Sequence, residues 1–147
     1  MKSPSSPHGT QAWLSTVRAY NLCETVVSRR LAEIQLRVGD LEVLATLATR
    51  PGLSQRELAA RCFITKSGVS MLLTQMEERG LVVRGTDADD ARTKRLTLTA
   101  AGMALAEQAM QIQAEVVKAM VAGSSEAEIA TIGRVMERVS AQLEALL

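Results

Sequence analysis

The feature that most constrains this 147-residue chain is a change in hydrophobic period at Gly80. Up to that glycine, apolar residues recur every three or four positions, which is typical of helices with one buried face. After it, residues 81–84 and 95–99 form two short runs rich in Leu, Val and Thr, separated by a polar loop over residues 85–94. Two such runs around a loop predict a β-hairpin with a long tip, placed directly after a helix.

Two short helices are predicted before the hairpin. Ser54 and Glu57 have the spacing of a capping box, which predicts a helix that begins directly after Ser54. Thr65 is placed to cap a second helix that ends before Gly80, and the segment between the two helices is too short for more than a turn. Helix, turn, helix and hairpin in this order predict a winged helix-turn-helix over residues 41–99.

Longer helices are predicted on both sides of this unit. Residues 11–38 contain no Pro or Gly and have helical apolar spacing, so they predict a long first helix that Gly39 stops. Asp40 is expected to cap a short helix of about ten residues. Residues 100–122 and 126–147 predict two more helices. The expected fold class is therefore mainly α with a small β-hairpin wing, a winged helix-turn-helix plus terminal dimerisation helices.

The last predicted helix carries an apolar stripe with alternating spacings of three and four, as in a coiled coil. Its members are Ile129, Ile132, Met136, Val139, Leu143 and Leu146. We expect the helices over residues 10–38 and 100–147 to pack with their symmetry mates in a homodimer. The alternative is an intramolecular stripe that covers the first or fifth helix. Residues 1–9, rich in Pro and Ser, are expected to form a disordered tail, and residues 10–147 a single domain.

Composition excludes several classes of protein. The one His, His8, and the two cysteines, Cys23 and Cys62, supply neither a closed zinc site nor a histidine base inside the fold, so we expect no metal, no cofactor and no enzyme activity. No apolar stretch reaches the roughly 18 residues of a membrane span, and no leader precedes the first helix, so we expect a cytoplasmic protein with reduced thiols. Residues 50–99 hold nine basic and six acidic side chains, so a polyanion is expected to meet this middle third.

The second helix of the predicted helix-turn-helix has two distinct faces. At about 100° per residue, four apolar side chains fall on one face, which we expect to be buried: Val69, Leu72, Leu73 and Met76. The other face carries small hydroxyls near the helix N-terminus, which suit the base edges or phosphates of a DNA major groove. The predicted DNA contacts of this helix are Thr65, Lys66, Ser67, Ser70, Met71 and Thr74. A solvated polar face is the alternative interpretation.

Basic residues cluster at the tip of the predicted hairpin. Arg92, Lys94 and Arg95 lie within four positions and are long enough to reach phosphates or a narrow minor groove. Three aspartates precede them, and we expect one carboxylate to pair with Arg92 or Arg95 and to brace the loop. A solvated run of charges is the alternative.

Five short motifs stand in a fixed order along the chain. They are Leu58-Ala59-Ala60-Arg61, Thr65-Lys66-Ser67-Gly68-Val69-Ser70, Glu77-Glu78-Arg79-Gly80-Leu81-Val82, Asp90-Ala91-Arg92 and Leu98-Thr99-Ala100-Ala101-Gly102. Together with the long first helix, they resemble the MarR family of bacterial transcriptional regulators over residues 11–147. The most specific part is the Asp-x-Arg of the wing, followed at the family's spacing by Leu-Thr-x-x-Gly.

The resemblance implies a triangular homodimer, held by its terminal helices, that binds a pseudo-palindromic operator in double-stranded DNA. It also implies a repressor that a small ligand or an oxidant releases. Arg92 matches the wing arginine that enters the minor groove, and Asp90 matches the acid that braces it. The start of the family's recognition helix is matched by Thr65, Lys66, Ser67 and Ser70. The chain departs from the family at Met71, where many members have Arg, and at Gly68, where a larger residue is common.

Three interpretations of regulation and partner remain open. The first is release by a small apolar effector held between the dimer helices and the DNA-binding lobe. The second is a thiol-based organic-hydroperoxide sensor, because Cys23 follows Leu22 in the first helix, as the reactive cysteine does in one branch of the family; a buried inert thiol is its alternative. The third is a winged-helix module that binds an acidic protein partner.

Overall fold

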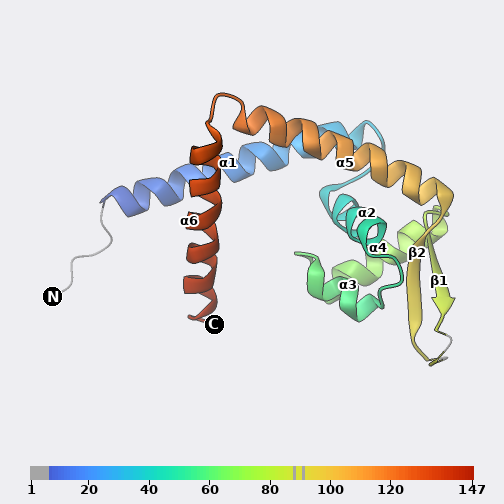
Figure 1. The fold of residues 1–147 in the computed structure, drawn as a ribbon. Helices are drawn as coiled ribbons and strands as arrows, with labels where there is room; N and C mark the ends of the chain where they lie inside the picture. Colours follow the sequence, from blue (N-terminus) through green and yellow to red (C-terminus); the bar gives the residue numbers. More distant parts are fainter. Residues whose placement is uncertain (1–6, 88, 91) are drawn as a thin grey trace. The chain divides into compact units, whose positions relative to one another are not determined.

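In a computed structural model, the structure describes residues 7–87, 89–90 and 92–147, which form six helices and a two-stranded antiparallel sheet (Figure 1). The elements are α1 (Pro7–Ala32), α2 (Val38–Thr49), α3 (Gln55–Arg61), α4 (Lys66–Glu78), β1 (Val82–Thr86), β2 (Lys94–Leu98), α5 (Ala100–Val121) and α6 (Glu126–Glu144). The predicted fold class is confirmed. The chain divides into two compact units, residues 1–116 and residues 117–147. In the described part of the chain, no helix combines the length and the hydropathy that crossing a membrane requires.

The first unit is built around one apolar core to which α1 to α5 and both strands contribute. Its largest fully buried side chains are Leu31, Leu44, Leu47, Leu58, Leu73, Met76, Leu96, Val43 and Val69. The helix α2 packs against α1, α3, α4 and β2 and so lies at the centre of the unit. Because interiors are densely packed, this core fixes α3 and α4 relative to the hairpin.

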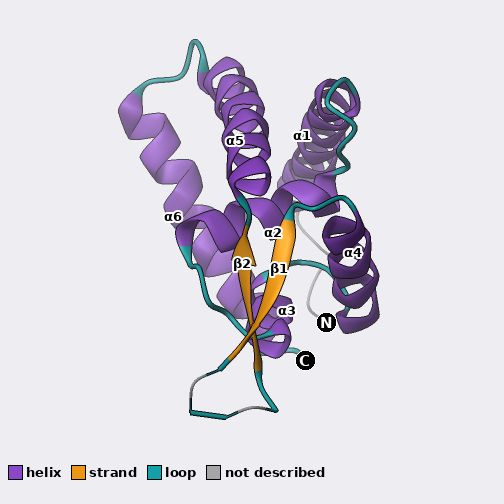
Figure 2. Cartoon of the chain, turned by 90° about the vertical axis from the view of Figure 1, so that its right-hand side faces the viewer, coloured by secondary structure: helices purple, strands orange, loops and turns teal. Residues whose placement is uncertain are grey.

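The hairpin pairs Val82 with Leu98 at its base and Thr86 with Lys94 at its far end. Figure 2 shows the two strands running away from the helices to the loop that joins them. The turn before α3 extends the sheet, since the Gly52 N–H donates to the Leu96 carbonyl at 2.9 Å and the Leu96 N–H donates to the Leu53 carbonyl at 2.8 Å. The hairpin is therefore hydrogen-bonded to the helix-turn-helix along β2.

The end of α1 differs from the prediction. The helix stops at Ala32, because Gln35 adopts a left-handed φ of 58° and the Leu36 N–H returns to the Leu31 carbonyl at 3.0 Å. This is a Schellman ending, which closes the helix and brings Leu36 into the core with 2% of its surface exposed. The sequence carries no glycine at Gln35, so it contains no local signal for this stop.

The start of α2 corrects the roles predicted for Gly39 and Asp40. Arg37 is the N-cap, and its N–H donates to the Asp40 carboxylate at 2.8 Å, so Asp40 lies in the first turn of α2. Gly39 also lies inside α2, where an added Cβ would approach Leu72 to 3.1 Å. A carboxylate stabilises either position by interacting with free N–H groups, which is why residue type alone misplaced the boundary by three residues.

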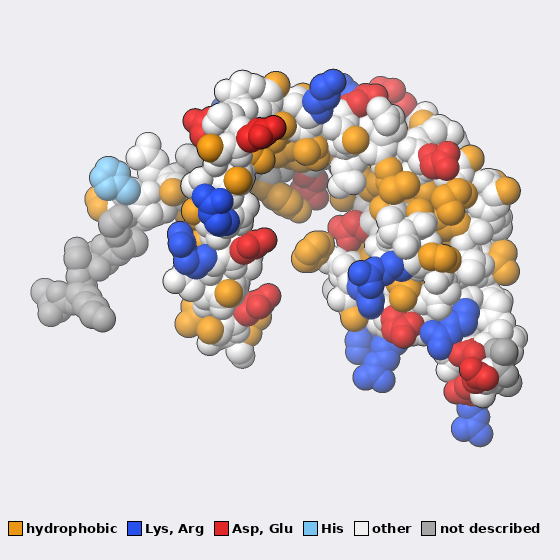
Figure 3. Space-filling view, in the orientation of Figure 1, with side chains coloured by type: hydrophobic (Ala, Val, Ile, Leu, Met, Phe, Trp, Pro, Cys, Tyr) orange, Lys and Arg blue, Asp and Glu red, His pale blue; other side chains and the backbone are white. Residues whose placement is uncertain are grey.

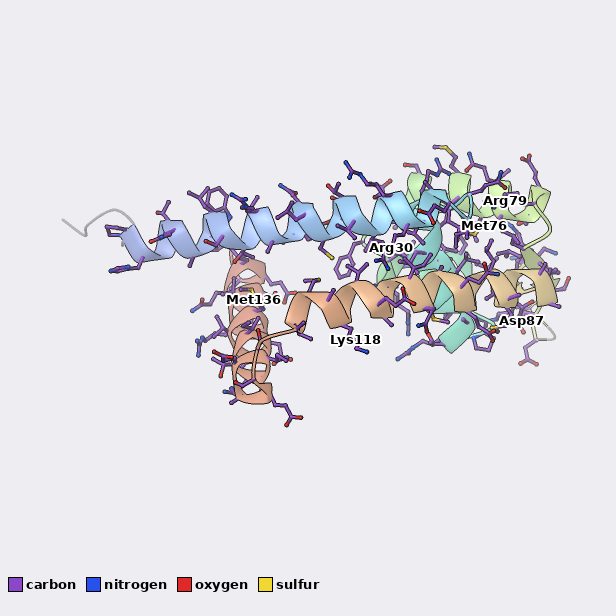
Figure 4. The ribbon with its side chains drawn as sticks, turned by 90° about the horizontal axis from the view of Figure 1, so that it is seen from above. Arg30, Met76, Arg79, Asp87, Lys118 and Met136 are labelled. Atoms are coloured by element: carbon purple, nitrogen blue, oxygen red, sulfur yellow. The ribbon has the colours of Figure 1, made fainter. Side chains whose placement is uncertain are left out.

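The predicted tail is also corrected in part. Pro7 opens α1, and residues 7–9 are helical, as the first helical position tolerates a residue without an N–H. Residues 1–6 lie outside the described residues. Further along, α1 and α5 lie side by side (Figure 4), and Arg30 binds Glu115 across them at 3.0 Å. This pair is exposed, so its contribution is below about 1 kcal/mol.

The wing, α4 and α5 meet at one junction. Gly80, with φ 71°, ends α4 in a second Schellman turn, in which the Leu81 N–H donates to the Met76 carbonyl at 2.9 Å. The Thr99 hydroxyl donates to the Gly80 carbonyl at 2.7 Å and accepts from the Gly102 N–H at 3.0 Å. The Leu-Thr-x-x-Gly motif thus joins the end of the wing to the end of α4.

The second unit, residues 117–147, consists of the end of α5 and the whole of α6. Ser125 caps α6, accepting from the Glu128 N–H at 3.2 Å while the Glu128 carboxylate accepts from the Ser125 N–H at 2.8 Å. The Ser125 N–H, followed by the Ser125 side chain, holds the pKa of the Glu128 carboxylate below its ordinary value. The predicted capping box is confirmed. None of the residues of α6 is buried, and its apolar stripe is exposed.

Candidate nucleic-acid interface

The helix α4 begins where the sequence predicts. The Thr65 hydroxyl accepts from the Gly68 N–H at 3.1 Å, which is the side-chain bond of an N-cap. The predicted buried face is confirmed, since Val69, Leu72, Leu73 and Met76 are the buried residues of this helix. An added Cβ at Gly68 would come within 2.7 Å of the Ile64 side chain. Packing against Ile64 therefore favours glycine at this position, independently of any contact with DNA.

The opposite face of α4 is open. Lys66, Ser67, Met71 and Thr74 are exposed and Ser70 is half-buried, all on the side away from the core. The Thr74 hydroxyl donates to the Ser70 carbonyl at 3.1 Å, so its oxygen remains able to accept. Met71 exposes 60% of its surface, so an apolar side chain is presented beside these hydroxyls. The structure thus brings the predicted contacts of α4 onto one solvent-facing surface.

The tip of the wing presents Arg92. Its side chain is exposed, and its guanidinium has no partner among the residues that the structure describes; the neighbouring Ala91 lies outside them. The Asp90 carboxylate accepts from the Arg92 N–H at 2.9 Å and from the Thr93 hydroxyl at 3.1 Å. Asp90 therefore braces the loop through the backbone of Arg92 and leaves the guanidinium available.

Arg95 instead lies at the base of the tip and is held by the protein. Its guanidinium pairs with Asp87 at 2.8 Å and with Glu57 at 3.2 Å, and it also donates to the Gly52 carbonyl at 3.4 Å. The Asp89 N–H and the Arg95 guanidinium together hold the pKa of Asp87 below its ordinary value. The expected pairing of a wing aspartate with an arginine is confirmed for this pair. Glu57 is a partner that sequence reasoning missed.

A second arginine, Arg84 on β1, ties the wing to both helices of the helix-turn-helix. It forms an ion pair with Glu77 of α4, and its Nη1 donates to the Gln55 side chain of α3 at 2.8 Å. Arg84 thereby compensates the charge of Glu77, a carboxylate that would otherwise repel DNA phosphates. We define the arginine clamp as Arg84 and Arg95 with these partners, because together they fix the hairpin against α3 and α4.

Two further cations lie beside α4. Gln55, Arg56, Ala59 and Lys66 line a surface hollow of about 290 Å³ at the start of α3 and α4. Arg56 is exposed, like Lys66, and neither forms an ion pair within the described ranges. Arg56 was missed at the sequence level, since the only signal was a single cation in the first turn of α3. Lys94 is also exposed, and its ammonium donates to the Thr86 hydroxyl across the hairpin at 3.4 Å.

The charges gather on one side of the first unit. Figure 3 shows Lys and Arg side chains projecting below α3 and at the tip of the hairpin, in the lower right of the view. The exposed cations of this unit include Arg56 of α3, Lys66 of α4 and Arg92 of the loop between β1 and β2. A duplex with one negative charge per roughly 1.7 Å would meet its complement on this side.

The two cysteines are free thiols of different surroundings. Cys62 packs against the core beside Thr46, and burial followed by the nearby Glu42 charge raises the pKa of its thiol, whereas the Thr46 hydroxyl opposes that shift. A raised pKa disfavours the nucleophilic thiolate. Cys23 is half-buried and lines a cavity of about 440 Å³ between α1, α2, α5 and the turn before α4. Its predicted redox role stays a prediction.

A helix-turn-helix with an exposed hydroxyl-bearing helix face and a basic hairpin defines a winged-helix DNA-binding protein. The family model described as the MarR family matches residues 27–93. An uncharacterized HTH-type transcriptional regulator of Bacillus cereus is 32% identical over 105 residues, which are 71% of this chain and 69% of that protein. The chain therefore belongs to the MarR family, and it is a transcriptional regulator that binds DNA.

Two other matches agree with this assignment. An HTH-type transcriptional repressor of Mycobacterium tuberculosis is 35% identical over 83 residues, covering 56% of this chain and 60% of that protein. The crystal structure of a Staphylococcus aureus MepR–DNA complex superposes with a TM-score of 0.79 at 24% identity, over 89% of this chain and 96% of that one. The second match concerns the fold.

Proposed function

We propose that this protein is a homodimeric repressor of a pseudo-palindromic operator, with the N-terminal half of α4 in the major groove and the wing tip in the adjacent minor groove. The observation that carries this proposal is that the arginines of the wing differ in their partners. Arg84 and Arg95 are bound by the protein, whereas the guanidinium of Arg92 has no protein partner in the described segments. An arginine on a fixed hairpin that is left unpaired suits the enhanced negative potential of a narrow minor groove.

The contacts of α4 would read the DNA in two ways. Lys66 and Arg56 supply charge for phosphates on either side of the helix start, which sets register without reading sequence. Ser67 and Thr74 offer hydroxyls to base edges, and the exposed Met71 offers an apolar contact that a thymine methyl can meet. The operator is therefore expected to differ from those of relatives that carry Arg at this position.

The test is a fluorescence-anisotropy titration of DNA from upstream of the protein's own gene against a scrambled duplex, at several salt concentrations. Arg92→Ala should weaken operator binding roughly tenfold or more, while Arg29→Ala, an exposed arginine on α1, serves as the matched control. Equal affinity of Arg92→Ala and the control would refute the wing assignment. An affinity for both duplexes that hardly changes with salt would favour a protein-binding module over DNA binding.

The dimer is proposed from the apolar stripe of α6. Its side chains remain 37% to 58% exposed at Ile129, Ile132, Met136, Val139 and Leu143, and Leu146, which follows the end of α6, is 81% exposed. The helix α1 adds exposed Trp13 and Leu14. Apolar stripes of this length mark surfaces that bind other helices, and a two-fold dimer would space two recognition helices by about one turn of DNA, roughly 34 Å.

Light scattering of purified variants tests the dimer. Leu143→Glu places a charge on the stripe and should yield a monomer, whereas Ala141→Glu places the same charge on the opposite side of α6 and should leave the dimer intact. A dimer that survives Leu143→Glu would place the seam elsewhere. Operator affinity should fall together with the dimer, because the monomer should bind a half-site far more weakly than the dimer binds the operator.

Release by a small ligand is proposed for the cavity of about 440 Å³ in the first unit, which falls within the usual size range of ligand sites. The ligand would act by favouring a geometry with wrongly spaced recognition helices. A thiol switch is the second candidate, since Cys23 is a free thiol at this same cavity. Operator binding lost on organic hydroperoxide treatment and restored by a thiol would favour the switch; indifference to oxidation would favour the ligand.

A further inference from the structure

The cavity beside Cys23 has an unusual set of walls. The helix α1 supplies Tyr20, Cys23, Glu24 and Val27, α2 supplies Val38, Leu41 and Glu42, and Phe63 and Gln113 complete it. All nine residues belong to the first unit. Its volume of about 440 Å³ suits a molecule of one ring or a short branched chain.

Two of the three aromatic residues in the chain line this one cavity. Tyr20 exposes 64% of its surface and Phe63 exposes 99%, although the chain has a single Tyr, a single Phe and a single Trp. A fully exposed Phe between two helices leaves its ring face open to a ligand. Aromatic faces carry negative charge density, so they attract cations as well as apolar groups.

The charges of the cavity have one sign. Glu24 is exposed and forms no ion pair within the described part of the chain, while Glu42 accepts the Phe63 N–H at 2.9 Å through one carboxylate oxygen. That hydrogen bond holds the Glu42 carboxylate beside the aromatic position. None of the nine lining residues is Lys, Arg or His. Arg61 lines the adjoining hollow, and its guanidinium donates to the Glu57 carbonyl.

We propose that this cavity binds an organic cation with an apolar body, such as a quaternary ammonium or a protonated amine. The two carboxylates would neutralise its charge, the rings of Tyr20 and Phe63 would contact the charged group and its carbon neighbours, and Val27 and Leu41 would contact the apolar body. An aromatic carboxylate has no cation to pair with among these walls. This proposal specifies the class of small ligand for the release mechanism described above. It rests on that mechanism only for the effect of the ligand on DNA binding.

The cavity also touches the segment that leads into the recognition helix. Phe63 lies two residues before Thr65, which caps α4, and its backbone is tied to α2 through Glu42. A cation at Glu42 and Phe63 therefore contacts the turn of the helix-turn-helix directly. Only a ligand that binds one arrangement of this turn more tightly than another shifts its population.

The experiment is calorimetric titration of the full-length protein, without DNA, with three probes of similar size. They are benzyltrimethylammonium, the neutral 4-tert-butylbenzyl alcohol and the anionic 4-tert-butylbenzoate. We expect the cation to bind at least tenfold more tightly than the alcohol, and the benzoate more weakly than both. A benzoate or alcohol that binds as tightly as the cation would overturn the proposal.

Variants locate the site. Glu42→Gln keeps an acceptor for the Phe63 N–H and should reduce affinity for the cation about tenfold with little change for the alcohol; Glu107→Gln, an exposed carboxylate on α5 outside the cavity, is the control. Phe63→Leu removes the ring face and retains an apolar side chain. Cation affinity that survives Glu42→Gln, Glu24→Gln and Phe63→Leu alike overturns the assignment. Operator anisotropy on the same samples separates the claims, because a protein that binds the cation and no operator refutes the proposed function alone.

Discussion

Gly102 is the position at which one added methyl group should affect the fold most. An ideal Cβ there would lie 2.0 Å from the Leu81 carbonyl oxygen and 2.9 Å from its carbon, both of them backbone atoms. To reach 3.0 Å from that oxygen, the start of α5 must move by about 1 Å away from the end of the wing. Side-chain rotation cannot relieve the contact, because the obstruction is the main chain.

The cost of that movement follows from the hydrogen bonds that cross the junction. The Thr99 N–H donates to the Leu81 carbonyl at 3.0 Å, the Thr99 hydroxyl to the Gly80 carbonyl at 2.7 Å, and the Gly102 N–H to the Thr99 hydroxyl at 3.0 Å. At about 1 kcal/mol each, their loss amounts to about 3 kcal/mol. Alanine regains up to about 1 kcal/mol of helix propensity, so Gly102→Ala should lower the free energy of unfolding by about 2 kcal/mol.

Urea unfolding followed by circular dichroism, at one fixed protein concentration, measures this change. Gly133→Ala is the matched control, because Gly133 lies within α6 and an added Cβ there meets nothing within 4 Å. The control should be neutral or stabilising by up to about 1 kcal/mol. If Gly102→Ala also proved neutral or stabilising, the close approach of α5 to Leu81 would be wrong.

Three further changes test the clamp, its pH dependence and the thiol. Arg84→Met should weaken operator binding several-fold without changing the salt dependence, because Arg84 fixes the wing against Glu77 and does not contact phosphate; a shallower salt slope would make it a DNA contact. The folded pKa of Asp87 is lowered, so its stabilisation is complete above its unfolded pKa and is lost as pH falls through the folded value. Asp87→Asn should therefore flatten the acid side of the stability profile in thermal melts, and an unaltered profile would contradict this. If the cavity responds to a ligand, Cys23→Ser should bind the operator like the wild-type protein, and organic hydroperoxide should release neither of them. A hydroperoxide that releases the wild-type protein but not Cys23→Ser would instead identify a thiol sensor.

Local signals in the sequence predicted most helix boundaries of this fold. Ser54 and Ser125 each precede a glutamate by three residues, and both form the expected capping boxes. Gly80 ends α4 in the left-handed conformation that glycine adopts without strain. These features depend on residues within one helical turn, so the sequence contains all the information that they require.

The two wrongly predicted boundaries, the end of α1 and the start of α2, are ones that local signals do not determine. Gln35 ends α1 in a left-handed conformation because the core accepts Leu36, and that burial depends on residues far along the chain. Asp40 was placed as a cap because carboxylates favour several positions at a helix start. At the end of α1 the tertiary contact decided between local alternatives, whereas at the start of α2 the sequence left several positions of the carboxylate locally equivalent.

In the candidate site, too, local features could be predicted from the sequence and long-range contacts could not. The exposed face of α4 followed from helical spacing, because one buried stripe defines the opposite face. The partners of Arg84 and Arg95 did not follow, since Gln55 and Glu57 are separated from them by 29 and 38 residues. Only the pairing of β1 with β2 and the packing of α3 bring these groups together. The difference between an arginine available for DNA and one held by the protein is therefore a tertiary property.

The two faces of α4 also bear on how such a regulator changes its target. Val69, Leu72, Leu73 and Met76 hold the helix in the core, whereas Ser67, Met71 and Thr74 face solvent. Mutations in the second group leave the packing intact, so most lie within about 0.5 kcal/mol of neutral for stability. A duplicated copy of this gene is thus free to drift through many operator preferences while it continues to fold. Libraries randomised at these three codons sample that space directly, and selection on new operators need not be paired with selection for stability.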